Sequence, residues 1–437
     1  MLLNIRKYLS QYKGLKKLYW TLRRVMHKFL SKAKRLPGKF RNLFRVAHRY
    51  LKKRKLAVYA NRIAIVPGRI LFFAFQNNYA CNPKYICEEL IRQQVPVELV
   101  WCVDQIHEEI AQAFPKQVRL VEYGTTEYEE ALHSALIWID NGFYAVKDPF
   151  LIKKSQQVYI QTLHGSLGIK KIDAKAIPDK ARNRRARLCG KLTDYCISNS
   201  RFETEVYRTS FWPDAEILEY GHARNDMILN KEPHYVAEVR KKLLDYYHLD
   251  EKVKTILWAP TFSDDSGERK SQILESFDYT RLLTAFQDKT GETWAVLARL
   301  HPRDHRHLAD GMQLPDCVVN AGDYPDMQEL IIAADIGITD FSSWIFDFVI
   351  TGKPGFIFAP SLTSYESQQG FYYPIQTTPF PVASTPDQLY QNVTEFDAAQ
   401  YADRVRQFLD EKGCVEDGKA CARVVSKIKE IIAEKRA

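Results

Sequence analysis

The sequence predicts an α/β protein with two parallel sheets, because apolar runs of strand length alternate with amphipathic helical segments in two successive series. The chain of 437 residues is longer than one ordinary core accommodates. Apolar residues make up 46% of it, which supplies material for two cores and excludes a disordered chain. Two Rossmann-like domains are therefore expected.

The first series begins past residue 68. Strands are expected at 69–76, 97–103, 135–140, 158–163, 195–198 and 217–220, and helices at 83–94 and 201–209. The second series predicts strands at 255–258, 294–300, 335–339 and 355–359. The polar, proline-containing stretch around 230–234 separates the two series. The expected domains are thus 61–230 and 231–437, the second with a C-terminal helix.

The region 1–60 ahead of these domains is strongly basic. Residues 1–87 carry 22 Lys or Arg and no Asp or Glu, whereas the remainder carries 41 basic and 53 acidic side chains. Apolar residues recur at helical spacing over 15–30 and again over 39–55, with Pro37-Gly38 between them. Such helices suit an anionic membrane surface, nucleic acid or the acidic surface of the body. Their bulky apolar faces favour the membrane, and no nucleic acid partner is expected.

Composition restricts the compartment as well. The eight cysteines form no Cys-x-x-Cys pair and no dense framework, which is typical of a reducing cytosol without structural disulfides. No continuous apolar run has the length of a membrane span, and no signal peptide is recognisable at the N-terminus. A cytoplasmic protein attached to the membrane from one side is expected.

The segment 335–354 predicts an anion site. An expected strand at 335–339 is followed by the polar residues Asp340-Phe341-Ser342-Ser343, then by apolar residues at helical spacing over 344–351. Free N–H groups and the positive dipole end of such a helix favour phosphate, and ligands bind beyond the carboxyl ends of strands in open α/β sheets. The alternative is that Ser342 or Ser343 only caps the helix.

A second candidate site follows the expected strand 158–163. His164 stands there with Gly165 and Gly168, which permit close approach of a ligand, and with Lys170 and Lys171, which can neutralise phosphate. A histidine in this position is a candidate general base, because its ordinary pKa lies near neutral pH. The alternative is a capping histidine in a tight loop.

Three further motifs follow strands, at 221–226, 259–262 and 299–302, and an exposed turn lies at 417–420. The first would lie at the hinge between the domains. Histidines at 301, 305 and 307 are not completed by a carboxylate or a cysteine at helical spacing, so no metal site is expected.

Taken in order, these motifs resemble those of the CDP-glycerol glycerophosphotransferase family, which builds wall teichoic acids and related polyol-phosphate polymers in bacteria. The matching segments are His-Gly-Ser-Leu-Gly-Ile-Lys-Lys (164–171), Gly-His-Ala-Arg-Asn-Asp (221–226), Ala-Pro-Thr-Phe (259–262), Arg-Leu-His-Pro (299–302), Thr-Asp-Phe-Ser-Ser (339–343) with Asp-Phe (347–348), and Asp-Gly-Lys-Ala (417–420). The resemblance covers about 79–425, including Asn82-Pro83-Lys84.

The chain departs from the family pattern at three motifs. Ser166-Leu167 stand where the family usually has Thr-Pro, His222-Ala223 where it has Tyr-Pro, and Phe262 where it has Trp. Serine keeps the hydroxyl of threonine, so the chemistry is expected to survive.

The resemblance implies a GT-B fold, with two Rossmann-like domains facing across a cleft and a basic region that holds the enzyme at the cytoplasmic face of the cell membrane. It implies transfer of glycerol phosphate from CDP-glycerol to a hydroxyl of a lipid-linked acceptor, with release of CMP. That acceptor would be a prenyl-diphosphate-linked saccharide or a polyol phosphate. CDP-glycerol is the donor substrate, no further cofactor is implied, and a homo-oligomer is compatible with the sequence.

The resemblance also assigns site residues. His164 and His301 match catalytic positions, His164 as the base and His301 together with Arg299 at the diphosphate. The other residues expected to bind CDP-glycerol are Thr261, Ser342, Ser343, Asp347 and Lys419, although Asp347 could equally be structural. Residues expected at the hinge or the acceptor are Lys170, Arg224, Asn225 and Asp226.

Three alternatives remain open at this point: a CDP-ribitol ribitolphosphotransferase, a GT-B glycosyltransferase that uses a nucleotide sugar, and a lipid-binding protein without catalysis.

Overall fold

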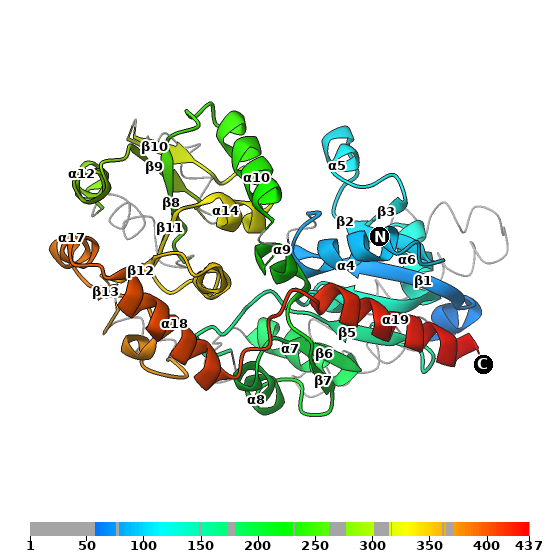
Figure 1. Ribbon diagram of the computed structural model, residues 1–437. Coiled ribbons are helices and arrows are strands. Elements are labelled where there is room, and N and C mark those ends of the chain that lie inside the picture. Colours follow the sequence, from blue (N-terminus) through cyan, green and yellow to red (C-terminus); the bar gives the residue numbers. More distant parts are fainter. Residues whose placement is uncertain are drawn as a thin grey trace, which may run out of the picture.

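The structure is a computed structural model of the whole chain (Figure 1). It describes residues 57–75, 78–147, 151–172, 180–229, 232–261, 277–300, 314–315, 317–360, 362–363 and 370–436. The basic segment 1–55, Phe262 and the three histidines of 301–307 lie outside the described residues. Among the residues that are described, no helix combines the length and apolar character that a membrane crossing requires.

The first sheet has seven parallel strands in the order β3-β2-β1-β4-β5-β6-β7. They are β1 (Val66–Phe73), β2 (Glu98–Val103), β3 (Val118–Glu122), β4 (Ala135–Asp140), β5 (Val158–Gln161), β6 (Tyr195–Ser198) and β7 (Glu216–Glu219). The expected strands are confirmed, with small shifts at their ends. The edge strand β3 was not predicted, because it is only half-buried and carries Arg119 and Glu122 among its apolar residues.

The second sheet has six parallel strands in the order β10-β9-β8-β11-β12-β13. They are β8 (Lys254–Trp258), β9 (Trp294–Ala298), β10 (Val318–Asn320), β11 (Ile336–Thr339), β12 (Gly355–Phe358) and β13 (Val382–Ala383). The two edge strands, β10 and β13, are two or three residues long and were not predicted, since so short a run has no readable period. Two parallel sheets agree with the expected pair of Rossmann-like domains.

Helices cover both faces of each sheet, as the parallel order requires. They are α4 (Cys81–Arg92), α5 (Glu108–Gln112), α6 (Thr126–Ser134), α7 (Lys180–Leu192), α8 (Arg201–Thr209), α9 (Asp226–Leu229), α10 (Pro233–Tyr246), α12 (Tyr279–Thr290), α14 (Met327–Ala333), α15 (Ile345–Phe348), α17 (Pro386–Thr394), α18 (Ala398–Lys412) and α19 (Ala420–Arg436). Strand β1 shows the division: Ile70 and Phe72 belong to the core under α4, whereas Leu71 and Phe73 belong to the core under α6, α7 and α8.

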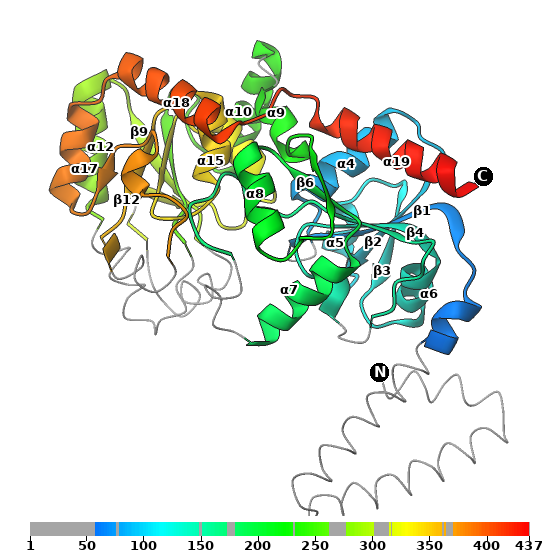
Figure 2. The same cartoon turned by 90° about the horizontal axis from the view of Figure 1, so that it is seen from below.

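The C-terminal helix α19 packs on the first sheet. Its apolar residues Val424, Val425, Ile428, Ile431 and Ile432 share one buried cluster with β1 and α4. Figures 1 and 2 both show α19 beside α4, whereas α18 lies with the second sheet. The expected boundaries assigned this helix to the second domain. Its apolar stripe indicated a buried face but not the partner that buries it.

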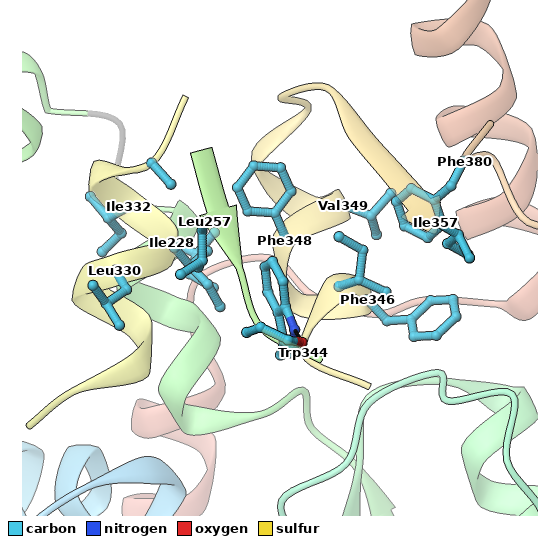
Figure 3. Packing of buried hydrophobic residues seen from close by; sticks show 14 of the residues in the cluster. Ile228, Leu257, Leu330, Ile332, Trp344, Phe346, Phe348, Val349, Ile357 and Phe380 are labelled. Carbon is cyan, nitrogen blue, oxygen red and sulfur yellow. Dashed lines mark hydrogen bonds between the residues drawn. The ribbon is translucent and has the colours of Figure 1, made fainter. Parts of the chain in front are cut away.

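The segment after β11 is anchored by bulky side chains (Figure 3). Trp344, Phe346 and Phe348 are buried, and the Trp344 indole donates to the Ala259 carbonyl at 2.7 Å. In β11, a β-carbon on Gly337 would lie 2.9 Å from the Phe348 ring, so only glycine fits there. The expected helix 344–351 is one turn of α-helix, α15, followed by the 3-10 turn η5 (Val349–Thr351).

Candidate active site

Of the predicted site residues, Thr261, Ser342 and Ser343 follow the strands where the order of the second sheet reverses, and His164 follows the strand next to the reversal in the first sheet. The reversal falls between β1 and β4 in the first sheet and between β8 and β11 in the second. His164 follows β5, the strand next to β4, and Thr261 and Ser342-Ser343 follow β8 and β11. Ligands of open α/β sheets bind at these crossover points.

Direct contacts join the two sets of loops. The Lys170 ammonium donates to the Thr261 hydroxyl at 2.9 Å. Lys170 also pairs with Phe371 in an isolated antiparallel bridge. A β-carbon on Gly168 would lie 3.3 Å from the Ser343 β-carbon, so this glycine lets the two loops meet. Both sheets therefore contribute to one site.

The loop that carries His164 is held through its backbone carbonyls. The Asn82 amide donates to the two carbonyls that precede His164, both at 3.1 Å. The Arg224 guanidinium donates to the carbonyl of Gly165 at 2.7 Å, and the Tyr373 hydroxyl donates to that of Leu167. Because the holding groups come from both halves of the chain, the position of His164 depends on how the halves meet.

The same loop contains two strained residues. Leu163 and Leu167 have φ values of 49° and 31°, in the left-handed region that non-glycine residues rarely adopt. Such strain persists where surrounding contacts over-determine the backbone, and it is typical of functional loops.

The His164 side chain is exposed, and its Nδ1 faces the loop that follows β4. Its Nδ1 lies 2.5 Å from the Asn141 carbonyl oxygen, and its ring lies 5.2 Å from that of Phe75. The surrounding protein lowers the pKa of His164 by displacing bulk water. The Asn141 contact opposes this shift, and the charges of Arg224 and Arg182 add to it. A neutral imidazole that still reaches solvent is suited to accept a proton.

Lys170 is half-buried in the contact between the halves. Burial lowers the pKa of Lys170 to about 8, and the Asp340 carboxylate opposes this shift. Asp340 itself is buried and accepts from the backbone N–H groups of Thr261 at 2.7 Å and Phe341 at 2.5 Å. A lysine of lowered pKa thus lies beside the Thr261 hydroxyl.

Neither Ser342 nor Ser343 caps the following helix. Trp344 occupies the N-cap position of α15, and no side chain accepts a capping hydrogen bond there. Both serines are partly exposed. Because α15 has only four residues, its dipole contributes little, and anion binding would depend on the hydroxyls and on Lys170.

Asp347 lies inside the protein. Arg224 donates to its two carboxylate oxygens at 2.8 and 3.1 Å, and the amides of Asn225 and Gln328 donate to it at 3.1 and 3.3 Å. Asp347 is 3% exposed and Arg224 2%. The structure therefore places Asp347 in a buried ion pair that joins the two halves, which is the structural role that the sequence left open.

Asp226 also has a structural position. It accepts from the backbone N–H groups of Ala420 at 2.9 Å and Cys421 at 2.7 Å, and so caps the start of α19. Lys419 precedes this cap as an exposed residue whose own N–H donates to Asp417 at 3.1 Å.

Arg299 follows β9 and is half-buried. Its guanidinium donates to the carbonyls of Ala321 at 3.1 Å and Tyr324 at 2.7 Å. The predicted partner of Arg299 at the diphosphate, His301, lies outside the described residues.

Two residues that join the halves were not predicted. Asp326, at the N-cap of α14, accepts from the Lys84 ammonium at 2.5 Å and the Tyr85 hydroxyl at 2.7 Å. Glu416 accepts from the amides of Asn225 at 2.7 Å and Asn199 at 3.1 Å. Lys84 belongs to the Asn82-Pro83-Lys84 motif. Neither Asp326 nor Glu416 lies in a sequence pattern that predicts a contact between the halves.

Comparisons with known proteins agree with this geometry. Residues 56–430 match the family described as CDP-glycerol:poly(glycerophosphate) glycerophosphotransferase. A teichoic acid poly(glycerol phosphate) polymerase of Staphylococcus epidermidis is 30% identical over 371 residues, which cover 82% of this chain and 50% of the relative. A teichoic acid glycerol-phosphate transferase of Staphylococcus aureus is 27% identical over 376 residues, which cover 82% of this chain and 92% of the relative.

The chain spans about half the length of the first two curated polymerases that it matches. Among solved structures, that of the wall teichoic acid polymerase TagF superposes with a TM-score of 0.74 and 26% identity over 92% of this chain and 100% of that one. A variant of the same polymerase was soaked with CDPG. UDP-bound MnaA of S. aureus, at 14% identity and a TM-score of 0.51, shares the fold alone over 83% of this chain and 95% of that one. The chain belongs to the CDP-glycerol:poly(glycerophosphate) glycerophosphotransferase family.

Proposed function

We propose that the chain transfers glycerol phosphate from CDP-glycerol to a hydroxyl of a membrane lipid-linked acceptor and releases CMP. The reaction would serve the synthesis of teichoic acid or a related polyol-phosphate polymer. The observation that carries the proposal is the position of His164, an exposed imidazole of lowered pKa, in a loop that contacts Ser343 and Thr261 through Gly168 and Lys170.

His164 would act as the general base. Its Nδ1–H donates to the Asn141 carbonyl, which fixes the tautomer and leaves the Nε2 lone pair for a proton. As the acceptor oxygen forms its bond to the phosphorus of the donor, the hydroxyl proton passes to Nε2. The bond between that phosphorus and the oxygen of CMP breaks, and CMP leaves with the negative charge.

Lys170 and the hydroxyls of Thr261, Ser342 and Ser343 would bind the diphosphate. Negative charge shifts to the leaving CMP as the transfer proceeds, and a cation with fixed hydroxyl donors stabilises that charge. Lys170 already contacts Thr261, so the cation is in place before the donor arrives. His301, Arg299 and Lys419 remain part of the proposed donor site by their match to the family motifs.

We also propose the GT-B arrangement, with domains at 61–230 and 231–437 facing across a cleft and with α19 of the second returning to pack on the first sheet. We further propose that residues 1–60 attach peripherally to the cytoplasmic face of the cell membrane. The basic, amphipathic pattern of 15–30 and 39–55 supports the attachment. Co-sedimentation with anionic vesicles tests it. The full chain should pellet and a chain lacking residues 1–55 should not, whereas equal pelleting would contradict the attachment.

The activity is tested by incubating the protein separately with CDP-glycerol, CDP-ribitol and UDP-sugars, each with a prenyl-diphosphate-linked disaccharide. Release of CMP from CDP-glycerol is expected. Release of CMP only from CDP-ribitol, or release of UDP from a UDP-sugar, would show that the donor is not CDP-glycerol. If no nucleotide were released, the proposed transferase activity would be wrong.

His164→Ala should abolish turnover and leave binding of CDP-glycerol, measured by calorimetry, nearly intact. The matched control is His107→Ala, because His107 is exposed and, as the N-cap residue of α5, makes no capping hydrogen bond through its side chain. Wild-type turnover in His164→Ala would overturn the assignment of the base.

A further inference from the structure

A lysine at the end of α18 lies among aromatic rings from both halves of the protein. The Lys412 ammonium lies 3.5 Å from the centroid of the Tyr373 ring, and 5.0 and 5.4 Å from those of Phe202 and Phe408. At these distances a cation is attracted to the face of an aromatic ring. Phe202 belongs to α8, and Figures 1 and 2 both show the C-terminal end of α18 beside that helix. These three rings, the ring set, therefore join the two halves around one cation.

The ring set holds the Lys412 side chain away from bulk water. Lys412 is half-buried, although a lysine at the end of a helix can extend into solvent. In the part of the chain that the structure describes, it forms no ion pair with an acid. Burial lowers the pKa of Lys412, and the charge of Glu411 opposes this shift. Attraction to the rings therefore offsets the loss of hydration.

Tyr373 carries this contact to the loop of the proposed base. Its hydroxyl donates to the carbonyl of Leu167, three residues after His164. Leu167 is buried and has the strained φ of 31°, so its backbone keeps this conformation only while surrounding contacts hold it. A cation over the face of a phenol draws electron density from the ring, which strengthens the hydroxyl as a hydrogen-bond donor. Lys412 thus acts on the loop through Tyr373.

The backbone beside Tyr373 follows the same loop. Segment 370–372 lies antiparallel to 169–171. Two backbone hydrogen bonds join them, donated by the N–H of Tyr372 at 2.8 Å and by that of Lys171 at 3.2 Å. One segment of the second half therefore holds the loop, and Tyr373 supplies the contact that lies nearest the proposed base along the chain.

We infer that Lys412 and Tyr373 are positioning residues for the transfer: the cation keeps the Tyr373 hydroxyl at the Leu167 carbonyl, and this contact keeps His164 in place. The inference rests on the proposed function, in which His164 is the base. It adds that the base is placed by a contact between the halves, so the base is in position only while the halves are closed on each other.

Conservative variants separate the effect of the cation from that of the hydroxyl. Tyr373→Phe removes the hydroxyl and keeps the ring, and Lys412→Met removes the charge and keeps an unbranched side chain. Tyr390 of α17 offers a matched control, because its hydroxyl donates to the Asp278 carbonyl at 3.2 Å and the Arg281 guanidinium lies 4.1 Å from its ring centroid. Tyr390→Phe and Arg281→Met make the same two changes in helices that lie far from the first sheet (Figure 1).

The rate of CMP release from CDP-glycerol is the first measurement. In Tyr373→Phe, kcat should fall at least about tenfold while the dissociation constant of CDP-glycerol stays within about twofold, because a displaced base slows the transfer without removing a donor contact. Lys412→Met should lower kcat at least about threefold. The double variant should be no slower than Tyr373→Phe, because the cation acts through the hydroxyl. Both control variants should keep the wild-type kcat.

The second measurement needs no turnover. It is the ¹⁵N NMR spectrum of the His164 ring at a pH where the imidazole is neutral, with the signals identified by their loss in His164→Ala. Two well-separated ring signals are expected in the wild type and the controls, because Nδ1 faces the Asn141 carbonyl and one tautomer is favoured. In Tyr373→Phe, and to a smaller extent in Lys412→Met, the two signals should move toward each other as the ring loses its fixed orientation.

Three results would overturn the inference: equal kcat values in Tyr373→Phe and Tyr390→Phe, a fall in kcat with an unchanged His164 spectrum, or additive effects of Tyr373→Phe and Lys412→Met on kcat. If the wild type released no CMP, the proposed function would be wrong. The His164 spectrum would then still decide whether Lys412 and Tyr373 position the ring, so the two failures are distinguishable.

Discussion

Asp347→Ala should strongly destabilise the protein, because it leaves the Arg224 guanidinium buried without its counter-charge. Burial acts to lower the pKa of Arg224, but the Asp347 carboxylate, together with Cys81 and Glu203, raises the pKa overall. Removing one partner of a buried pair costs about 3–5 kcal/mol. The Gln328 amide also loses its acceptor and the Asn225 amide keeps only Glu416, so the cost should not fall below this range.

Urea unfolding followed by circular dichroism measures this cost. With a slope of about 3 kcal/mol per M, a loss of 3–5 kcal/mol lowers the midpoint by about 1–1.7 M. Asp245→Ala is the matched control, because Asp245 pairs with Lys241 at 2.8 Å with both side chains about 60% exposed. It should cost less than about 1 kcal/mol.

A double variant, Arg224→Met with Asp347→Leu, removes both charges and should recover part of the lost stability. If Asp347→Ala shifted the midpoint no more than Asp245→Ala does, the pair would not be the buried link between the halves that its contacts indicate.

Two further predictions concern the pH profile and one concerns the fit of the loops. The value of kcat/KM should stay high as the pH falls to just below 6.5, because the pKa of His164 is lowered from that value and the base remains neutral. A loss of kcat/KM at or above pH 6.5 would contradict this. The value of kcat/KM should fall as the pH rises through about 8, where Lys170 loses its proton. Lys170→Arg should remove that fall, and an unchanged fall in this variant would show that Lys170 is not the titrating group. Gly168→Ala should raise KM for CDP-glycerol, because the new β-carbon lies 3.2 Å from the Ser166 carbonyl oxygen and 3.3 Å from the Ser343 β-carbon. Gly165→Ala meets nothing within 4 Å, and equal KM values in both variants would refute the tight fit at Gly168.

The strand ends that carry the site could be predicted from the sequence. Most buried strands are short apolar runs that end within a few residues of a polar one, as at Thr339-Asp340, and their alternation with helical segments predicts parallel sheets. The inward orientation of the Asp347 side chain could also be predicted in part. It lies three residues after Trp344, which is buried, so the helical period turns Asp347 inward.

The links between the halves could not be predicted. Arg224 meets Asp347 across 123 residues of chain, and Lys84 meets Asp326 across 242. Local periodicity carries no information over such distances, and a charged residue in a loop looks the same whether its partner is water or a buried acid. The sheet on which α19 packs could not be predicted for the same reason, because an apolar stripe does not specify which sheet it covers.

The return of α19 to the first sheet has a consequence for the order of folding. During synthesis the strands of the first sheet emerge from the ribosome first, but the apolar face that α19 covers stays open until the whole second sheet has been made. On that face, Ile70, Phe72 and Leu90 stay uncovered until Val425 and Ile428 of α19 pack against them. The second sheet can therefore close its own core before the first, which inverts the usual N-terminal-first order of multidomain chains.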